Sequence, residues 1–160
     1  MPASAIVNAP QIPEASPCPP TIHGSAVLVG ARAVLIRGPS GSGKSSLALA
    51  LLQAADHGAL PFARLVGDDR VHVEAAHGRL LVRPAATLEG QIEVRGLGVR
   101  RVEHEPVAVV GLTVELGAAV ERLPEPAQQE ALIAGVRLPR LAVAAGVDPL
   151  PLLMAYIRTA

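Results

Sequence analysis

Residues 38–45 read Gly-Pro-Ser-Gly-Ser-Gly-Lys-Ser and match the full phosphate-binding loop pattern. Its glycines let the backbone curl so that successive N–H groups point at phosphate oxygens, and the positive end of a following helix faces the same anion. The lysine is expected to reach the β- and γ-phosphates, and the last serine to bind Mg²⁺. The pattern therefore predicts an ATP site made of Gly38, Pro39, Ser40, Gly41, Ser42, Gly43, Lys44 and Ser45.

The position of Lys44 strengthens this interpretation. The chain has 14 basic residues, and Lys44 is its single lysine. An apolar segment precedes the loop and a helical pattern follows it, as a phosphate-binding loop requires. The alternative is a glycine-rich turn between a strand and a helix that binds nothing, and this context argues against it.

Two adjacent carboxylates, Asp68 and Asp69, follow the next apolar segment. The acidic residue of nucleotide sites with this loop commonly follows such a strand. Two neighbouring carboxylates can divide the work, one facing the metal and the other acting as base toward a substrate hydroxyl. The alternative is a polar turn after a strand, because aspartate is common in turns.

Three further residues are ambiguous when taken alone. A histidine before a strand, such as His23, is more often a surface or capping residue than a catalyst. Glu93 and Arg95 alternate on one expected strand, which is typical of a solvated ion pair. The other four histidines show no metal-ligand spacing, so no metal site is assigned to them.

Apolar periodicity and turn residues predict the elements that position these side chains. Strands are expected at residues 25–29, 33–37, 64–67, 71–74, 79–83, 92–95 and 107–114, and helices at residues 45–55, 128–134 and 150–158. A strand, loop, helix and strand near the front indicate an α/β core, and the hairpins behind it indicate a mixed sheet. The expected fold is a phosphate-loop nucleotide-binding core with a mixed, partly antiparallel sheet flanked by helices.

The first 20 residues contain six of the 15 prolines and a single charge. Such a stretch is unsuited to helices and paired strands, so residues 1–20 are interpreted as a flexible leader and residues 21–160 as the catalytic domain. A signal peptide is not expected, since no basic segment followed by an apolar block begins the chain.

Composition excludes several classes of protein. The 14 basic and 14 acidic residues balance, and the only aromatic residues are Phe62 and Tyr156, which argues against a nucleic-acid binder. One cysteine, Cys18, excludes an intrachain disulfide and a cysteine-cluster metal site. No segment is predicted to span a membrane, because charges and prolines interrupt the apolar runs. A reduced, cytoplasmic setting is expected.

The order of these motifs resembles the catalytic domain of the HPr kinase/phosphorylase family. Thr-Ile-His-Gly at residues 21–24 is followed by the phosphate loop, by Leu-Val-Gly-Asp-Asp at 65–69 and by Ile-Glu-Val-Arg-Gly-Leu-Gly-Val at 92–99. The last motif is similar to that family's own signature and is more specific than the loop. The resemblance spans about residues 21–143 and is especially close to the short alphaproteobacterial form, which lacks an extra N-terminal domain.

This resemblance implies a role for each matching residue. His23 would assist the acidic pair, and one of the two aspartates, with Asp69 favoured, would take the proton from the target serine. Lys44 and Ser45 would keep their phosphate and metal roles, and Glu93 would contribute to Mg²⁺. The catalytic set is then His23, Lys44, Asp68, Asp69 and Arg95, with Arg122, in Glu-Arg-Leu-Pro at 121–124, as a weaker match.

The chain departs from the family pattern in two places. Residues 56–61 look inserted between the loop and the aspartate pair. After Arg140 the family has a basic proline-glycine-arginine stretch tied to dephosphorylation, whereas here the next basic residue is Arg158. Kinase chemistry is therefore better supported than phosphorolysis.

The favoured interpretation is an ATP- and Mg²⁺-dependent serine kinase that acts on HPr, the phosphocarrier of the sugar phosphotransferase system, with weak phosphorolytic removal of the phosphate. Family resemblance suggests a homo-oligomer, a hexamer. Two alternatives stay open: a small-molecule kinase that uses the same loop, and a nucleotide-sensing module without catalysis.

Overall fold

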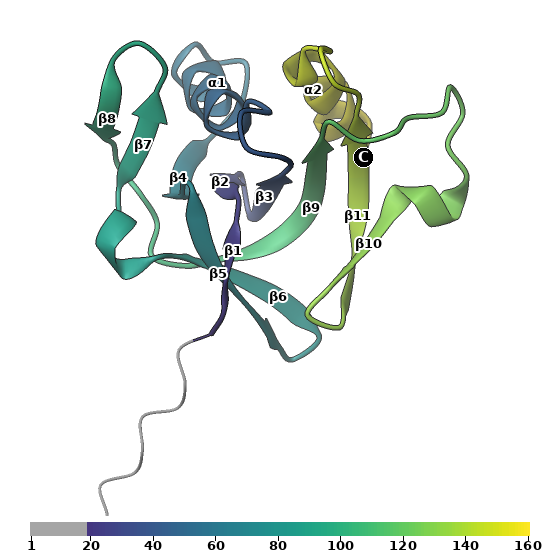
Figure 1. Ribbon diagram of the computed structural model, residues 1–160, viewed down its shortest axis with the longest axis horizontal. Helices are drawn as coiled ribbons and strands as arrows, with labels where there is room; N and C mark the ends of the chain where they lie inside the picture. The colour runs from purple at the N-terminus through teal and green to yellow at the C-terminus, as the bar shows by residue number, and fades with distance from the viewer. Residues whose placement is uncertain (1–18) are drawn as a thin grey trace, which may run out of the picture.

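The computed structural model describes residues 19–160 and folds them into eleven strands and two α-helices (Figure 1). The helices are α1 (Lys44–Asp56) and α2 (Pro149–Thr159), and two short 3₁₀ helices are η1 (Ala86–Leu88) and η2 (Pro126–Gln129). The strands are β1 (Thr21–His23), β2 (Ser25–Val29), β3 (Arg32–Arg37), β4 (Ala63–Gly67), β5 (Arg70–Ala76), β6 (Arg79–Pro84), β7 (Gln91–Val94), β8 (Gly98–Arg101), β9 (Ala108–Leu116), β10 (Glu130–Ile133) and β11 (Val136–Val143).

The nine-residue strand β9 is the central strand of the main sheet. Seven strands of that sheet have the order β1-β5-β6-β9-β3-β2-β4, and β11, which pairs with β10, joins it at β9. One edge of β9 pairs in parallel with β3, and its other edge pairs first with β6, antiparallel, and then with β11, parallel. The carboxyl ends of β3, β9 and β11 therefore lie side by side at one end of the sheet, next to α1 and α2 (Figure 1).

Two apolar cores hold the central strands from both faces. Val34 and Ile36 of β3 belong to the core that includes residues of α1 and α2, whereas Ala33 and Leu35 belong to the core that includes residues of β5 and β6. Successive side chains of a strand point to opposite faces, so a strand covered on both faces is apolar along its whole length. This explains the uninterrupted Ala-Val-Leu-Ile run of β3.

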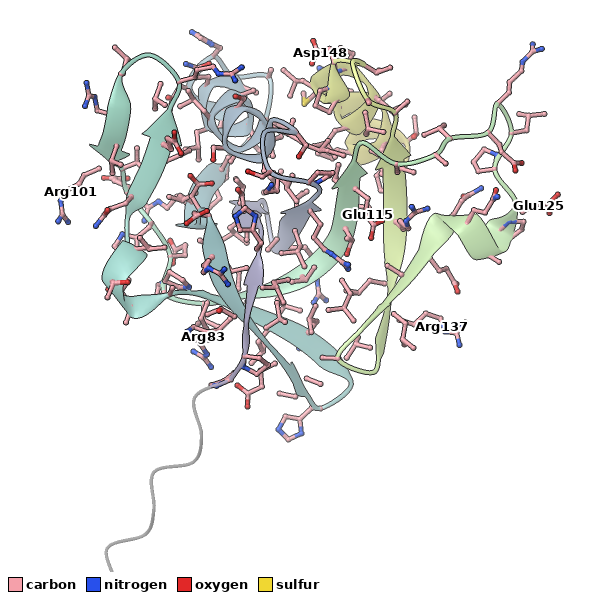
Figure 2. All side chains as sticks on the ribbon, in the orientation of Figure 1. Arg83, Arg101, Glu115, Glu125, Arg137 and Asp148 are labelled. Carbon is pink, nitrogen blue, oxygen red and sulfur yellow. The ribbon has the colours of Figure 1, made fainter. Side chains whose placement is uncertain are left out.

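Glu115, near the end of β9, forms ion pairs with arginines of the two neighbouring parallel strands. Its carboxylate lies 3.6 Å from Nη1 of Arg37, at the end of β3, and 3.1 Å from Nη2 of Arg140 on β11. Figure 2 shows Glu115 at this position between the neighbouring strands. The two pairs therefore link the carboxyl ends of β3 and β11 to β9.

The structure confirms the expected fold class and all seven expected strands, with small shifts at their ends. The helices expected at residues 45–55 and 150–158 are α1 and α2. The prediction of a helix at residues 128–134 is wrong, because the 3₁₀ helix η2 ends at Gln129 and residues 130–133 form strand β10. Ala134 and Gly135 have φ angles of 48° and 77°, which turn the chain back into β11 and close a hairpin that the sequence pattern did not reveal.

Apart from Pro19 and Pro20, the leader expected at residues 1–20 lies outside the described residues, and its separation from a catalytic domain at 21–160 stays a prediction. Within the described part, neither helix has the length and apolar character needed to cross a membrane.

Candidate active site

The phosphate loop connects the end of β3 to the start of α1 and depends on its glycines. Gly41 and Gly43 have φ angles of 76° and 96°, in the left-handed region that disfavours other residues. A Cβ built on either glycine meets no atom within 4 Å, so both face open space. Gly43 caps α1 without a side-chain hydrogen bond, and the first turn of the helix has no acidic residue. The loop therefore presents the positive end of a helix to the open side.

Lys44 is the buried cation of this loop. Only 6% of the residue is exposed, and its Nζ donates hydrogen bonds to the carbonyls of Gly38 (3.0 Å) and Pro39 (2.9 Å). No ion pair with an acidic residue is formed by Lys44 within residues 19–160. A buried ammonium without a carboxylate partner is suited to neutralise an anion that enters the loop.

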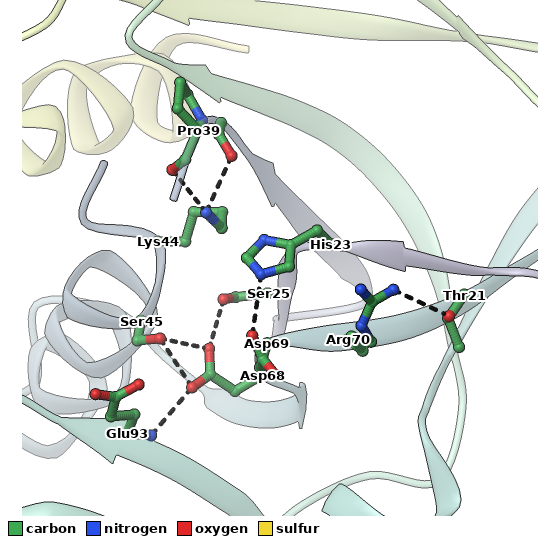
Figure 3. Close-up of polar contacts among 11 residues, drawn as sticks. Thr21, His23, Ser25, Pro39, Lys44, Ser45, Asp68, Asp69, Arg70 and Glu93 are labelled. Carbon is green, nitrogen blue, oxygen red and sulfur yellow. Dashed lines mark hydrogen bonds and ion pairs between the residues drawn. The ribbon is translucent and has the colours of Figure 1, made fainter. Parts of the chain in front are cut away.

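Asp68 is a buried carboxylate, 3% exposed, that accepts hydrogen bonds from three different elements (Figure 3). The hydroxyl of Ser45, on α1, lies 2.8 Å from both carboxylate oxygens. The hydroxyl of Ser25, on β2, donates to Oδ1 at 2.5 Å, and the backbone N–H of Glu93, on β7, donates to Oδ2 at 3.0 Å. Hydrogen bonds of this kind satisfy an ionised carboxylate away from water.

Asp69 faces His23 instead of the buried network. Its Oδ1 lies 3.1 Å from Nε2 of His23, and the two side chains are 60% and 44% exposed. Asp69 has a φ angle of 66°, and its carbonyl accepts a hydrogen bond from the N–H of Gly24. This turn directs the two adjacent carboxylates to different surroundings, one buried against α1 and the other accessible beside a histidine.

A pocket of about 330 Å³ brings most of the expected site residues together. His23, Asp69, Glu93 and Arg95 line it on one side, and the loop and the start of α1, including Lys44, line it on the other. Glu93 and Arg95 form no ion pair with each other, so the solvated pair weighed from the sequence is not present. Cations, carboxylates and an imidazole thus converge on one cavity.

Of the other expected residues, Asp68 does not line this pocket but is hydrogen-bonded to Ser45, which does. Gly38, Pro39 and Ser42 belong to the loop without lining the pocket. Arg122 neither lines the pocket nor belongs to the loop. It follows β9 and lines a separate pocket beside α2, together with Glu121 and Arg140. A catalytic role for Arg122 stays a prediction that this placement does not support.

Ser25 was missed by the sequence reasoning. It is fully buried, and its hydroxyl holds the carboxylate of Asp68. The only sequence signal is a serine that opens an otherwise apolar strand two residues after His23, a pattern that is common where no site exists.

The residues present fit both ATP and Mg²⁺. The hydroxyl of Ser42 is buried in the loop with no hydrogen-bond partner in the described part of the chain, and the space beside Gly41 and Gly43 is open. Mg²⁺ is usually held by one or two protein oxygens together with substrate phosphates. Ser45, Asp68 and Glu93 supply such oxygens, and no cluster of three or more metal-ligating side chains occurs among residues 19–160.

Comparison with known families gives one matching family model, the HPr serine kinase C-terminal domain, over residues 18–105. That segment includes the loop, both aspartates and the Glu93–Arg95 strand.

Two curated relatives and one solved structure are similar to the chain. The HPr kinase/phosphorylase of Clostridium beijerinckii is 40% identical over 78 residues, which are 49% of this chain and 24% of that protein. The HPr kinase/phosphorylase of Streptococcus pyogenes is 31% identical over 136 residues, 77% of this chain and 41% of that protein. The Hpr(Ser) kinase/phosphatase structure from Coxiella burnetii matches with a TM-score of 0.68 and 26% identity, covering 87% of this chain and 94% of that one.

Replacement of Ser25 by alanine is expected to destabilise the fold. The change removes a donor from a buried carboxylate, and an unsatisfied buried acceptor costs about 1–3 kcal/mol. Urea unfolding followed by circular dichroism measures the difference. Ser46→Ala is the matched control, because Ser46 is exposed on the same side of the site, and it should leave the free energy of unfolding nearly unchanged. A Ser25→Ala variant as stable as the unmodified chain would contradict the role assigned to this hydrogen bond.

Proposed function

The chain belongs to the HPr serine kinase C-terminal domain family, and from this premise we propose that it is an ATP- and Mg²⁺-dependent kinase that phosphorylates a serine of HPr, the phosphocarrier of the sugar phosphotransferase system. One observation carries the proposal: the pocket that joins the phosphate loop to the accessible His23–Asp69 pair. A nucleotide-binding loop alone serves many functions, whereas a carboxylate poised across from it suits transfer of phosphate to a hydroxyl.

The loop and Lys44 hold the phosphates in this proposal. The loop amides and the N-terminus of α1 bind phosphate oxygens, and the ammonium of Lys44 offsets the charge of the β- and γ-phosphates. Phosphoryl transfer depends mainly on such positioning and charge neutralisation. The burial of Lys44 strengthens its field, because little water screens it.

Asp69 acts as the base in this proposal. Its exposed carboxylate takes the proton of the serine hydroxyl while the serine oxygen bonds to the γ-phosphorus. The bond from that phosphorus to the bridging oxygen breaks, and ADP leaves. His23 holds Oδ1 of Asp69 at 3.1 Å and so keeps the carboxylate in position. The accessibility of the pair supports this assignment, since the serine arrives on another protein.

Asp68 and Ser45 are the candidate metal residues, with Glu93 beside them. Mg²⁺, when bound, neutralises phosphate charge and orients the transferred group. The Ser25 hydroxyl and the Glu93 N–H hold the carboxylate of Asp68 in place, and Asp68 in turn accepts from the Ser45 hydroxyl. A role for Arg95 in binding phosphate or acceptor is supported by its place in the pocket.

The small-molecule kinase and the non-catalytic sensor are less well supported, because the pocket is open beside Asp69 and contains a candidate base. The hexamer implied by family resemblance and the cytoplasmic setting expected from composition remain predictions.

Incubation of the purified chain with ATP, Mg²⁺ and its cognate HPr is expected to add one acid-stable phosphoryl group to HPr, measured by intact mass. Phosphoserine survives acid, whereas phosphohistidine does not. Lys44→Ala should abolish the product while the far-ultraviolet circular dichroism spectrum is retained. Phe62→Ala, distant from the loop, is the control and should keep the activity. Unmodified HPr after incubation with the intact chain, or full activity of Lys44→Ala, would overturn the proposal.

Asn variants of the two aspartates are expected to behave differently. Asp69→Asn removes the base and should lower kcat by about 10²–10⁴-fold with the Mg²⁺ requirement unchanged. Asp68→Asn should raise the Mg²⁺ concentration needed for half-maximal rate, because it removes a candidate ligand charge. Rates measured over a Mg²⁺ titration separate the two effects, with Asp56→Asn, at the end of α1, as the control. Equal and mild losses of kcat in both variants would show that the two aspartates only form a turn.

Phosphorolysis is expected to be much slower than the kinase reaction. It requires inorganic phosphate next to phosphoserine, and like charges in a partly dry site repel unless cations offset them. The two arginines nearest the missing basic stretch are already engaged: Arg137 with Glu130 and Arg140 with Glu115, both at 3.1 Å. Pyrophosphate release from serine-phosphorylated HPr and phosphate measures this reaction. A rate comparable to the forward rate would show that the basic stretch is not required.

A further inference from the structure

The hairpin formed by β7 and β8 exposes apolar side chains next to the pocket that contains Asp69. It stands beside α1 at the edge of the molecule (Figure 1). Leu97, at its turn, is 60% exposed, and Val99, on β8, is 59% exposed. Single exposed apolar residues are ordinary on a protein surface, whereas two within three positions at the rim of a candidate active site indicate a contact surface.

The Gly-Leu-Gly sequence at residues 96–98 holds Leu97 at the tip of the hairpin. Gly96 and Gly98 have φ angles of 83° and 78°, in the left-handed region that glycine adopts readily. The N–H of Leu97 donates a hydrogen bond to the carbonyl of Val94 at 2.9 Å, which closes the turn. A polar residue between the two glycines would suit such an exposed turn better. The turn therefore does not explain why this residue is a leucine.

The exposed surface of the hairpin is continuous with the wall of the pocket. Val99 lies directly opposite Glu93 in the strand register, so the two side chains point to the same side. Glu93 and Arg95 line the pocket that contains Asp69. Ile92, 1% exposed, packs into the core that includes residues of α1, and the N–H of Glu93 donates to Asp68. These contacts attach the hairpin firmly to the body of the protein.

The hairpin also has an excess of positive charge. Residues 91–101 contain one acidic residue and three arginines, Arg95, Arg100 and Arg101, in a chain whose charges balance overall. None of the three forms an ion pair among residues 19–160, and Figure 2 shows Arg101 pointing away from the body of the molecule. Arginines on an edge strand discourage pairing with another sheet, but that role does not account for the exposed apolar side chains. Both features together suit a partner surface that is apolar and bordered by carboxylates.

We propose that the β7–β8 hairpin is a docking surface for the acceptor protein HPr, whose contacting surface is apolar and bordered by carboxylates. The inference rests on the proposed kinase function and extends it to how the acceptor is recognised. A folded acceptor is too large for a pocket of about 330 Å³, so only its target serine reaches Asp69 and the surface around that serine lies on the rim. The hairpin forms part of that rim. Because it is held rigidly, docking on it costs little conformational entropy.

Kinetic constants for HPr test the apolar contact. Leu97→Ala should raise KM for HPr about tenfold and leave kcat nearly unchanged, because Leu97 contributes to docking and does not touch the reacting atoms. The affinity for Mg-ATP, measured by calorimetry, should stay the same. Leu132→Ala is the matched control, since Leu132 is 70% exposed on β10, and it should keep the KM of the unmodified chain. An unchanged KM in Leu97→Ala would overturn the docking surface.

Salt dependence tests the charged contact. Arg101→Glu should raise KM for HPr about tenfold at low ionic strength and make KM less sensitive to salt, because it replaces an attraction to carboxylates by a repulsion. Arg79→Glu, on β6, makes the same change of charge on another hairpin and is the control. The same KM and the same salt dependence in both variants would contradict an acidic partner surface.

Hydrogen–deuterium exchange locates the contact and separates the two proposals. In the presence of ADP, excess HPr should slow exchange of the amides of residues 97–101 and leave residues 130–133 unchanged. Protection without phosphorylation of HPr by ATP would keep the docking surface and reject the kinase. Phosphorylation without protection, and with KM unchanged in Leu97→Ala, would keep the kinase and reject the docking surface. A lower assembly mass of Leu97→Ala in sedimentation velocity would show that the hairpin joins copies of this chain, which also rejects HPr as its occupant.

Discussion

The hydrogen bonds to the carboxylate of Asp68 hold the candidate active site together. A buried charge is costly unless donors surround it, and here the donors come from β2, α1 and β7, while Asp68 itself follows β4. β7 belongs to a separate two-stranded sheet with β8, so its link to Asp68 joins that hairpin to the main sheet. Ile92, buried in the same core as Leu51 of α1, supports the link by packing. One carboxylate therefore positions the phosphate loop, the metal residues and the hairpin that carries Glu93 and Arg95.

The parts of the site that could be predicted from sequence are those that local chemistry decides. The phosphate loop needs glycines at positions of positive φ, a lysine and a serine at set spacing, so Gly41, Gly43 and Lys44 were found directly. The aspartates were found because two acidic residues that directly follow an apolar segment are expected to lie at the end of a strand. A division of work between them was expected from their adjacency. That one is buried and the other exposed follows from the turn at Asp69, which the sequence did not predict.

The remaining features depend on pairings between distant segments. Ser25 reaches Asp68 across 43 positions of sequence, and nothing near Ser25 indicates that partner. Residues 130–133 have an ambiguous apolar pattern, and pairing with β11 makes them a strand instead of a helix. Arg122 matched a family segment by its neighbours in sequence, but the chain after β9 carries it toward α2 and away from the loop. Sequence spacing cannot report such positions, because the fold sets them.

The parallel strands explain why the loop has a pocket on each side. One is the pocket that contains Asp69, and the other, of about 320 Å³, is lined by residues 39–42, 116–117 and 144–147. β3 lies between β2 and β9 in the sheet. β2 pairs with β4, which the two aspartates follow, and β9 pairs with β11. Acidic and basic side chains lie on the first side, and small neutral residues lie on the second. Exposed ion pairs contribute little to stability, but the pairs of Glu115 with Arg37 and Arg140 are partly buried and join the ends of three strands whose register the backbone pairing sets. Their effect is thus mainly geometric: they link the ends of the three strands, while the hydrogen bonds of Asp68 link β2, α1 and β7 beside the charged pocket.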